Sequence, residues 1–406
     1  MRTGGNHAPN RFRGEKSAYA VVVTDDVRTR PKNRRELILA AASVRFHQRG
    51  YAGTSLEDIA GDLGVTAPAL YRHFKGKDDL YTAALEVNLG HLENCIVDAK
   101  SADEAILGLS QVAVHFPTLG LLWNTDRRRR LVDPGGSIEQ RLGTVADELG
   151  LLLEAHADPE LAQLLSRSVL AASSSTGFYE TGLEAPDHAS QVERALTAVA
   201  LFRPTRPLVA LEVATEKVVA RPWTTRRSAL LDAGAILVVG RGGYQAVTVE
   251  EIAAAAGVSP NTLYLHFSGK ADLFAAVLRR AASWLTSALQ RASAQASTSE
   301  EALRLAIGAS LELSAQHPSW TGSLADEITN LPPDHIADVM TAVDEYLDEW
   351  FALCVANAPG LSPEHVRVRM RAALAVLDDR ALEAVGGRVF SSEDSANLAL
   401  AILRSE

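Results

Sequence analysis

The sequence contains little of the chemistry that marks secreted, membrane or disulfide-bonded proteins. Its 406 residues include only two cysteines, Cys95 and Cys354, which excludes a disulfide framework and fits buried thiols in a reducing cytoplasm. No apolar run reaches the roughly 18 residues of a membrane span. The N-terminal stretch has no apolar segment typical of a secretory signal. We therefore expect a cytoplasmic protein without a membrane partner.

Signatures of catalysis and of metal binding are missing as well. The chain has no GxSxG, Walker or HExxH motif, and no pair of carboxylates stands out. His91 and Cys95 could share a metal from one helix face, but no third ligand follows at a convincing spacing. The sequence thus predicts no enzyme activity, no metal and no cofactor. An enzyme on a helical scaffold is the rival from another class.

An overall excess of positive charge is missing too, because the net charge is −10. The charge is unevenly distributed, however. Residues 1–35 hold nine Lys or Arg against three Asp or Glu, and the windows 31–85 and 226–280 are slightly positive. Acidic residues collect elsewhere, as between Asp334 and Glu349. This pattern indicates a basic contact surface on an acidic body, as in proteins that bind nucleic acid.

The sequence repeats itself over a long period. Residues 51–85 and 244–278 share about 16 of 35 positions at a shift of 193. Upstream, RRELILAAASVRF corresponds to RRSALLDAGAILV. A period near 200 is too long for a solenoid and indicates that a whole unit is duplicated. The shared positions include Ile59 and Ile252, Gly64 and Gly257, Tyr71 and Tyr264, His73 and His266, Phe74 and Phe267, and Lys77 and Lys270.

Each copy is expected to fold into short helices joined by tight turns. In the first copy, Thr54 and Ser55 precede an acidic helix start, and Gly64 supplies a left-handed C-terminal residue. Thr66 is expected to cap the next helix, in whose first turn Pro68 is tolerated. The second copy repeats this order with Thr248, Gly257, Ser259 and Pro260. Two helices closed by a glycine turn predict a helix-turn-helix, whose second helix can enter the major groove.

The segments that carry this pattern resemble the signature of the TetR family of bacterial regulators. They read IA…GVTAPALYRHFKGKDDL and IA…GVSPNTLYLHFSGKADL. The resemblance covers about 50 residues in each unit. It implies recognition helices from Thr66 to Phe74 and from Ser259 to Phe267, with both phenylalanines in the core. The side chains expected at base edges are Thr66, Ala67, Pro68 and Ala69 in one unit, and Ser259, Pro260, Asn261 and Thr262 in the other.

The resemblance also implies contacts to the DNA backbone. Tyr71 and Tyr264 would donate their hydroxyls to phosphate, and His73 and His266 would lie beside the backbone. Lys77 and Lys270 begin the following helix, where the ammonium group and the helix dipole both favour phosphate. The remaining candidates are Thr54, Ser55 and Thr248, which would cap a helix and touch phosphate, and Arg72, which belongs to the first unit only.

We predict an all-α protein made of two tandem TetR-like units. The expected parts are a basic arm at 1–31, a DNA-binding domain at 32–92, a regulatory domain at 93–205, a linker at 206–223, a second DNA-binding domain at 224–284 and a second regulatory domain at 285–406. The Val-rich stretches 18–24 and 207–219 predict extended arms or short strands. Arg127–Arg130 is expected to be a solvated helix face, with an anionic ligand or a second DNA contact as the alternative. Trp320 and Trp350 are expected in the core.

The predicted function is a repressor that binds an operator in double-stranded DNA and responds to an unidentified small-molecule effector. Segments 159–178, 187–202, 362–384 and 392–404 are rich in Ala, Leu and Val and could pair the units as an intrachain pseudo-dimer. A homodimer of whole chains is the alternative. It is also open whether only one DNA-binding domain contacts DNA while the other unit serves dimerisation or ligand binding. Leu265 and Ser268 replace Arg72 and Lys75 in the second unit, which makes the second unit the weaker candidate for DNA binding.

Overall fold

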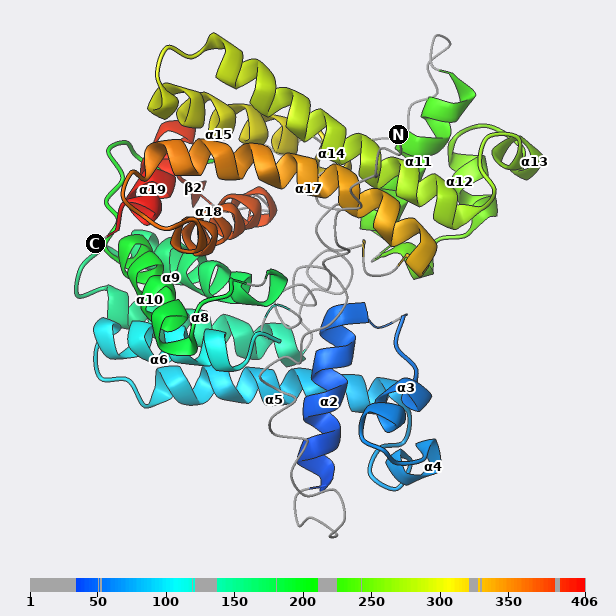
Figure 1. The fold of residues 1–406 in the computed structure, drawn as a ribbon, viewed down its shortest axis with the longest axis horizontal. Helices are drawn as coiled ribbons and strands as arrows, with labels where there is room; N and C mark the ends of the chain where they lie inside the picture. Colours follow the sequence, from blue (N-terminus) through cyan, green and yellow to red (C-terminus); the bar gives the residue numbers. More distant parts are fainter. Residues whose placement is uncertain are drawn as a thin grey trace, which may run out of the picture.

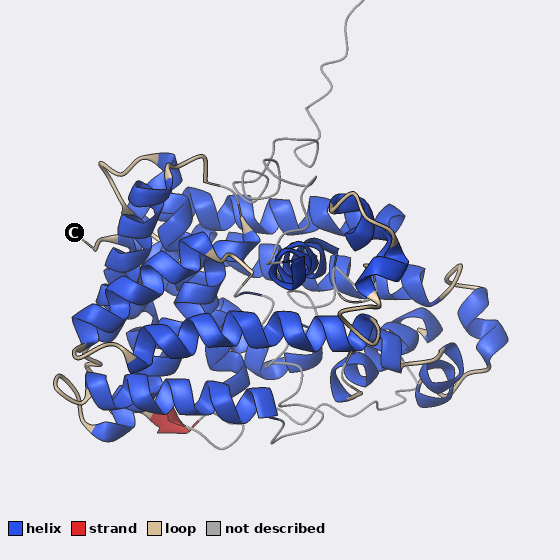
Figure 2. Cartoon of the chain, turned by 90° about the horizontal axis from the view of Figure 1, so that it is seen from below, coloured by secondary structure: helices blue, strands red, loops and turns tan. Residues whose placement is uncertain are grey.

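The computed structural model describes residues 34–49, 51, 53–118, 120, 137–179, 181–210, 225–241, 243–320, 328, 331–383 and 388–405. These residues are almost entirely helical (Figure 2). The described sheet is a single antiparallel pair, in which β1 (Val209–Ala210) lies beside β2 (Arg388–Val389). The predicted all-α class is therefore confirmed. None of the described helices is both long and apolar enough to cross a membrane.

The described α-helices of the two units follow the same order, whereas the short 3₁₀ helices η1 and η2 lie at different places. Unit 1 consists of α2 (Arg34–Arg49), α3 (Leu56–Asp62), α4 (Ala67–Leu70), α5 (Lys77–Val97), α6 (Ala102–His115), α8 (Ser137–Leu153), α9 (Pro159–Ser174), η1 (Ser175–Phe178) and α10 (Ala185–Ala200). Unit 2 consists of α11 (Arg226–Gly240), η2 (Tyr244–Ala246), α12 (Val249–Ala255), α13 (Pro260–Tyr264), α14 (Lys270–Gln295), α15 (Ser299–Gln316), α17 (Pro333–Asn357), α18 (Pro363–Glu383) and α19 (Ser392–Leu403). We call α2–α4 head 1 and α11–α13 head 2.

A long helix connects each head to the rest of its unit. Helix α5 starts beside head 1, packs on α2, and continues to α6 and α8. Helix α14 does the same for head 2 and lies along α15 and α17. Both helices run without a break through the boundaries expected at residues 92 and 284. A displacement in the helical body can therefore reach a head through one continuous helix.

The two units meet through four helices. Helices α9 and α10 of unit 1 pack against α18 and α19 of unit 2 (Figure 1). These helices lie in the segments that the apolar pattern indicated as pairing helices. One hydrophobic core runs from head 1 into α18 and α19, and it includes Leu165 of α9, Val199 of α10 and Ile402 of α19. Burial of apolar faces is thus shared between the units, as it would be inside one domain.

Polar contacts also join the units. Asp394, buried at the start of α19, accepts hydrogen bonds from the backbone N–H and the hydroxyl of Thr205, both at 2.8 Å, and from the N–H of Arg206 at 3.1 Å. Burial alone would raise the pKa of Asp394, but these hydrogen bonds and that from Ser391 hold it below its usual range. The carboxylate therefore fixes the chain that leaves unit 1 to the helix that ends unit 2.

Several sequence expectations fall on other parts of the chain. Trp320 and Trp350 are buried, which confirms their place in the core. Val209–Ala210 forms the short strand expected within 207–219. The basic arm with the stretch 18–24, the run Arg127–Arg130 and residues 211–224 lie outside the described residues.

Candidate nucleic-acid interface

The first motif helix is capped in the same way in both heads. Ser55 accepts a hydrogen bond from the N–H of Asp58 at 3.0 Å, and the Asp58 carboxylate accepts one from the N–H of Ser55 at 3.0 Å. In head 2, Thr248 and Glu251 form the same reciprocal box. Such boxes satisfy backbone donors that a helix start leaves unpaired. The caps predicted at Ser55 and Thr248 are confirmed.

The glycine turn between the motif helices is also as predicted. Gly64 and Gly257 have φ angles of 62° and 69°, in the left-handed region that suits glycine. After each glycine, the N–H of Val65 or Val258 bonds back to the carbonyl of Ala60 or Ala253 at 2.9 Å. The small alanine side chains are buried and let the second helix cross closely.

The second motif helix is shorter than the sequence suggested. Helix α4 ends at Leu70 and α13 at Tyr264, rather than at the predicted Phe74 and Phe267. In both heads the backbone continues as a tight turn. The N–H of Phe74 donates to Leu70 O at 3.0 Å, and the N–H of Phe267 donates to Leu263 O at 2.9 Å. The two phenylalanines are buried as predicted. Because their side chains pack in the core, each helix ends after about one turn.

The start of this helix differs between the heads. Ser259 caps α13 by accepting a hydrogen bond from the N–H of Thr262 at 3.3 Å. Thr66 occupies the corresponding position of α4, but its side chain makes no capping hydrogen bond. The predicted side-chain cap at Thr66 is therefore wrong, because only its carbonyl takes part, accepting from the Ala69 N–H at 2.8 Å.

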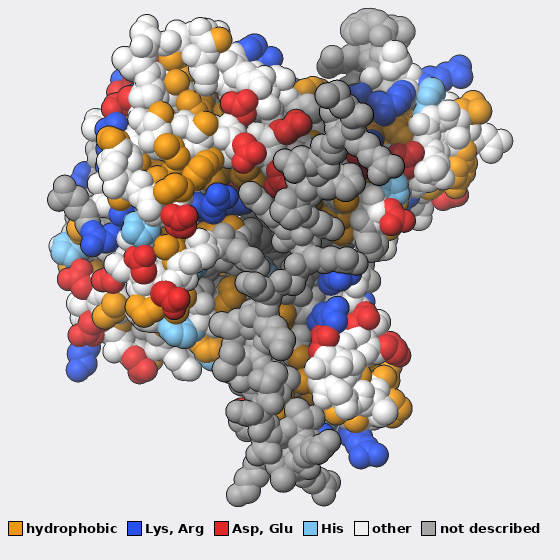
Figure 3. Space-filling view, in the orientation of Figure 1, with side chains coloured by type: hydrophobic (Ala, Val, Ile, Leu, Met, Phe, Trp, Pro, Cys, Tyr) orange, Lys and Arg blue, Asp and Glu red, His pale blue; other side chains and the backbone are white. Residues whose placement is uncertain are grey.

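The side chains expected at base edges lie at the tip of each head. Thr66 and Pro68 in head 1, and Ser259, Pro260 and Asn261 in head 2, are exposed, whereas Ala67, Ala69 and Thr262 are half-buried. Helices α4 and α13 lie on the same side of the molecule, away from the four-helix contact (Figure 1). Hydrophobic side chains and Lys or Arg side chains share the outer edge of both heads (Figure 3).

The tyrosines expected to contact phosphate are free to do so. Tyr71 is 55% exposed and Tyr264 is 56% exposed, so the duplicated side chains are equally accessible. Arg72, His73 and His266 are exposed beside them. Leu265, which follows Tyr264, is 80% exposed. Leu265 therefore does more than remove the charge of Arg72, because it adds an apolar side chain to the surface that would meet DNA.

Thr54 does not belong to this surface. It is only 2% exposed, and its hydroxyl donates to the carbonyl of Arg45 at 3.2 Å. The phosphate contact expected of Thr54 is therefore wrong, because its side chain joins the turn to α2 instead. Ser55 and Thr248 are at least partly exposed, although their hydroxyls are engaged in the caps.

The two lysines expected at phosphate are partly buried and contact other residues of the protein. The Lys270 Nζ donates to the carbonyls of Tyr244 and Val247 at 2.9 and 2.8 Å and lies 4.2 Å from the centroid of the Tyr244 ring. The Lys77 Nζ lies 4.2 Å from the centroid of the Tyr51 ring. Burial lowers the pKa of both ammonium groups. These contacts give Lys270 a structural part, in which it holds the loop before α12.

The two residues considered as a metal pair, His91 and Cys95, have other partners. The His91 ring stacks on Phe116 with 3.7 Å between the centroids, and the Cys95 Sγ donates to Ala105 O at 3.7 Å. Among the residues that the structure describes, no three His, Cys, Asp or Glu side chains are grouped to hold a metal. Burial raises the pKa of Cys95 to about 11 and that of Cys354 to about 12, so neither thiol is reactive near neutral pH.

The geometry of both heads defines a class, namely proteins with a helix-turn-helix. A family model described as "Bacterial regulatory proteins, tetR family" matches the chain twice, at residues 38–84 and 230–277. The two matches coincide with the two heads and extend into α5 and α14. The chain belongs to the TetR family and carries two tandem TetR units.

Individual relatives match parts of the chain. The regulator AcrR from Shigella flexneri is 37% identical over 24% of this chain and 45% of its own length. The transcriptional activator FasR from Mycolicibacterium smegmatis is 34% identical over 36% of this chain and 66% of its own length. The chain thus spans about half to two thirds of these relatives. The TetR family regulator PfmR from Thermus thermophilus is similar over 44% of this chain and 98% of its own, with 21% identity and a TM-score of 0.38.

Proposed function

We propose that the chain is a sequence-specific DNA-binding repressor of transcription, in which two unlike heads engage one operator under the control of a small-molecule effector. The observation that carries the proposal is the completeness of both heads. Each has a capped first helix, a left-handed glycine turn and a short second helix with an exposed tyrosine at its end. These are the parts that place a second helix in the major groove.

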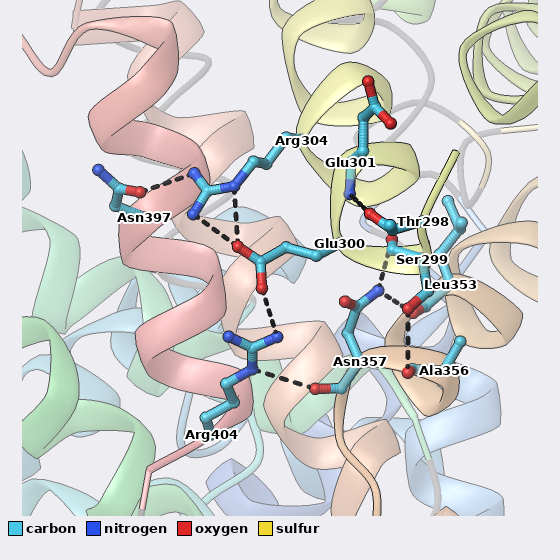
Figure 4. A network of polar contacts seen from close by, with 10 residues as sticks. All are labelled: Thr298, Ser299, Glu300, Glu301, Arg304, Leu353, Ala356, Asn357, Asn397 and Arg404. Carbon is cyan, nitrogen blue, oxygen red and sulfur yellow. Dashed lines mark hydrogen bonds and ion pairs between the residues drawn. The ribbon is translucent and has the colours of Figure 1, made fainter. Parts of the chain in front are cut away.

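The packing between the units supports pairing of the heads within one chain. In symmetric DNA-binding dimers, two copies of one interface set the distance between two identical heads. Here α9 and α10 pair with their duplicated counterparts α18 and α19. Helix α19 is in turn fixed to the body of unit 2, because Arg404 bonds to Glu300 at 2.8 Å and Arg304 bonds to Asn397 at 2.7 Å (Figure 4). We therefore favour a pseudo-dimer over a dimer of whole chains.

Differences between the heads support an operator with two unlike half-sites. Asn261 in head 2 takes the position of Pro68 in head 1, and an Asn amide can pair with both edge atoms of adenine. Head 1 offers Thr66, Ala67 and Pro68, which suit thymine methyl groups or DNA shape. Two identical heads would require a palindromic operator, whereas two unlike heads can bind an operator whose half-sites differ in sequence.

A matched pair of charge substitutions tests whether both heads bind. Tyr71→Glu and Tyr264→Glu change equally exposed side chains, so neither should disturb the core. Each places a negative charge where phosphate is expected. Leu151→Glu is the control, because Leu151 is 64% exposed on α8, away from both heads. Operators are first selected from a random DNA pool with the unaltered chain, and affinity and footprints are then measured for each variant.

We expect each tyrosine variant to weaken binding about tenfold or more and to remove protection from one half-site only. Leu151→Glu should bind as the unaltered chain does. If neither tyrosine variant changes affinity, the proposal fails. DNA binding alone does not distinguish a repressor from an activator, and the relative FasR is named as an activator. A reporter that carries the selected operator must therefore also show lower transcription in the presence of the chain.

A second candidate is a regulator in which only head 1 binds DNA. It is favoured by Leu265, whose exposed apolar side chain stands in place of Arg72. In that case Tyr264→Glu leaves affinity and footprint unchanged, whereas Tyr71→Glu abolishes binding. A homodimer of whole chains instead gives a palindromic footprint with symmetric losses and a solution mass of two chains.

A further inference from the structure

Unpaired polar atoms gather where the two units meet. Two of them are the Nε of Arg371 on α18 and the Nε2 of His188 on α10, each buried without a hydrogen-bond partner. The buried hydroxyl of Tyr179, just after η1, lies beside Ser175. The Arg371 guanidinium lies 5.7 Å from the Tyr179 ring centroid, and the Tyr179 and His188 rings are 6.0 Å apart. Buried polar atoms are nearly always hydrogen-bonded in native proteins, so such a cluster calls for an explanation.

The cluster continues on the side of unit 2. Trp350 Nε1 on α17 and Ser310 Oγ on α15 are also buried, and both lie close to the Tyr346 hydroxyl. The ring centroid of Tyr346 is 6.4 Å from that of Trp350, and Tyr346 also interacts electrostatically with Arg371. The boundary between the units is thus lined by aromatic rings and by N–H and O–H donors.

Charge makes Arg371 the centre of this cluster. Burial lowers its pKa, an effect opposed by Tyr179, Asp344 and Asp378 and reinforced by Arg367. Its guanidinium faces the Tyr179 ring, and a largely buried guanidinium whose Nε makes no hydrogen bond is costly for a fold to keep. A planar guanidinium matches a carboxylate with two parallel hydrogen bonds. Tyr and His side chains beside it can add further donors.

We propose that the unit boundary binds a small monocarboxylate with an apolar body, whose carboxylate is held by Arg371 with Tyr179 and His188 as additional donors. The apolar body would lie against Tyr346 and Trp350. This inference rests on the proposed function, because it names the chemical class of the effector. It places the effector between the units rather than inside either one.

The position of this site connects it to head 1. Tyr179 and Ser175 flank Gly177 of η1, and the Gly177 carbonyl accepts a hydrogen bond from Nε2 of His47 on α2. A Cβ at Gly177 would lie 2.1 Å from the Pro117 carbonyl oxygen, so only glycine permits this approach. A shift of η1 on ligand binding would therefore reach α2 directly.

The other side of the site connects to head 2. Tyr346 and Trp350 belong to α17, which packs along α14, and Gln290 of α14 bonds to Glu349 of α17 at 2.9 Å. Helix α14 begins at head 2, where Lys270 holds the loop before α12. A ligand at Arg371 therefore contacts elements that lead to both heads. The ligand changes DNA affinity only if it binds the DNA-competent arrangement of the heads and the alternative arrangement with different affinities.

A titration with matched probes tests the site. The probes are butanoate, octanoate, dodecanoate and 2-naphthoate, each compared with its neutral primary amide, and binding to the full chain is measured calorimetrically without DNA. The variant is Arg371→Met. The control is Arg367→Met, one turn away on the same helix, where the guanidinium lies 4.8 Å from the Phe351 ring centroid.

We expect at least one carboxylate to bind, and its amide to bind at least tenfold more weakly. Arg371→Met should weaken carboxylate binding at least tenfold, Tyr179→Phe by a smaller factor, and Arg367→Met by less than twofold. Without a probe, Arg371→Met should keep or raise the thermal unfolding midpoint, because it removes a largely buried guanidinium whose Nε makes no hydrogen bond. A purely structural arginine would instead lower the midpoint.

Two results would overturn the inference: no carboxylate binds the unaltered chain, or carboxylates bind it and Arg371→Met equally well. The proposed function is tested separately by DNA binding in the absence of any probe. If DNA binds and carboxylates do not, only the effector site is wrong. If carboxylates bind through Arg371 and DNA does not bind, only the regulatory role is wrong.

Discussion

Lys77 and Lys270 occupy the same position of a duplicated motif but make different contacts, which allows an internally controlled experiment. We compare Lys270→Met with Lys77→Met. Methionine keeps much of the apolar stem over the tyrosine ring and removes the ammonium group. In head 2 this deletes two hydrogen bonds to carbonyls and one cation–π contact, whereas in head 1 it deletes the cation–π contact of the ammonium with Tyr51.

The two losses differ in size. A hydrogen bond to a charged group contributes about 1.5–3 kcal/mol, but Lys270 is only partly buried and water can replace it at both carbonyls. A cation–π contact at such a site contributes about 0.5–1 kcal/mol. We therefore expect Lys270→Met to cost head 2 about 2 kcal/mol and Lys77→Met to cost head 1 about 1 kcal/mol or less.

Hydrogen exchange measured by mass spectrometry resolves the heads separately, which a single unfolding curve of a multi-unit chain does not. A loss of about 2 kcal/mol should speed amide exchange in α12 and α13 about 30-fold, and a loss of about 1 kcal/mol should speed exchange in α3 and α4 about fivefold. The opposite head serves as the control in each variant. Equal acceleration in the two heads, or none in head 2, would refute the structural part assigned to Lys270.

Single residues carry three further predictions. Asn261→Ala should cost about 1–3 kcal/mol of binding at one half-site and leave the preference of the other intact, as measured by selection and footprinting; symmetric loss would contradict unlike half-sites. Gly64→Ala should destabilise head 1 by about 1 kcal/mol, because φ is 62° and no neighbour blocks a Cβ; unchanged exchange in α3 would contradict this. The pKa of Asp394 is lower in the folded chain than its usual value of about 3.9, so its contribution to stability is complete above that value and is lost as the pH falls through the lower folded pKa. The thermal unfolding midpoints of the unaltered chain and of Asp394→Asn should therefore converge in acid. A difference between the two midpoints that stays constant from pH 7 to pH 3 would count against this role of Asp394.

Much of each head could be predicted from the sequence because its determinants are local. A Ser or Thr followed three residues later by an acid forms a capping box, and a glycine after the helix permits the left-handed turn. Phe74 and Phe267 were correctly placed in the core because the doubled motif fixed their spacing. The helical class and the tandem duplication are likewise properties of the residue pattern alone.

Other features depended on which side chains meet in space. Neighbouring sequence does not show that the Lys270 ammonium turns toward the carbonyls of Tyr244 and Val247, or that Thr54 is buried against Arg45. Nor could it bring Arg371 beside Tyr179, since these residues lie 192 positions apart and belong to different units. The sequence by itself determined the two heads, because caps, turns and helical periods act over a few residues. The tertiary structure decided the contacts between the units, because those depend on long-range packing that no local pattern encodes.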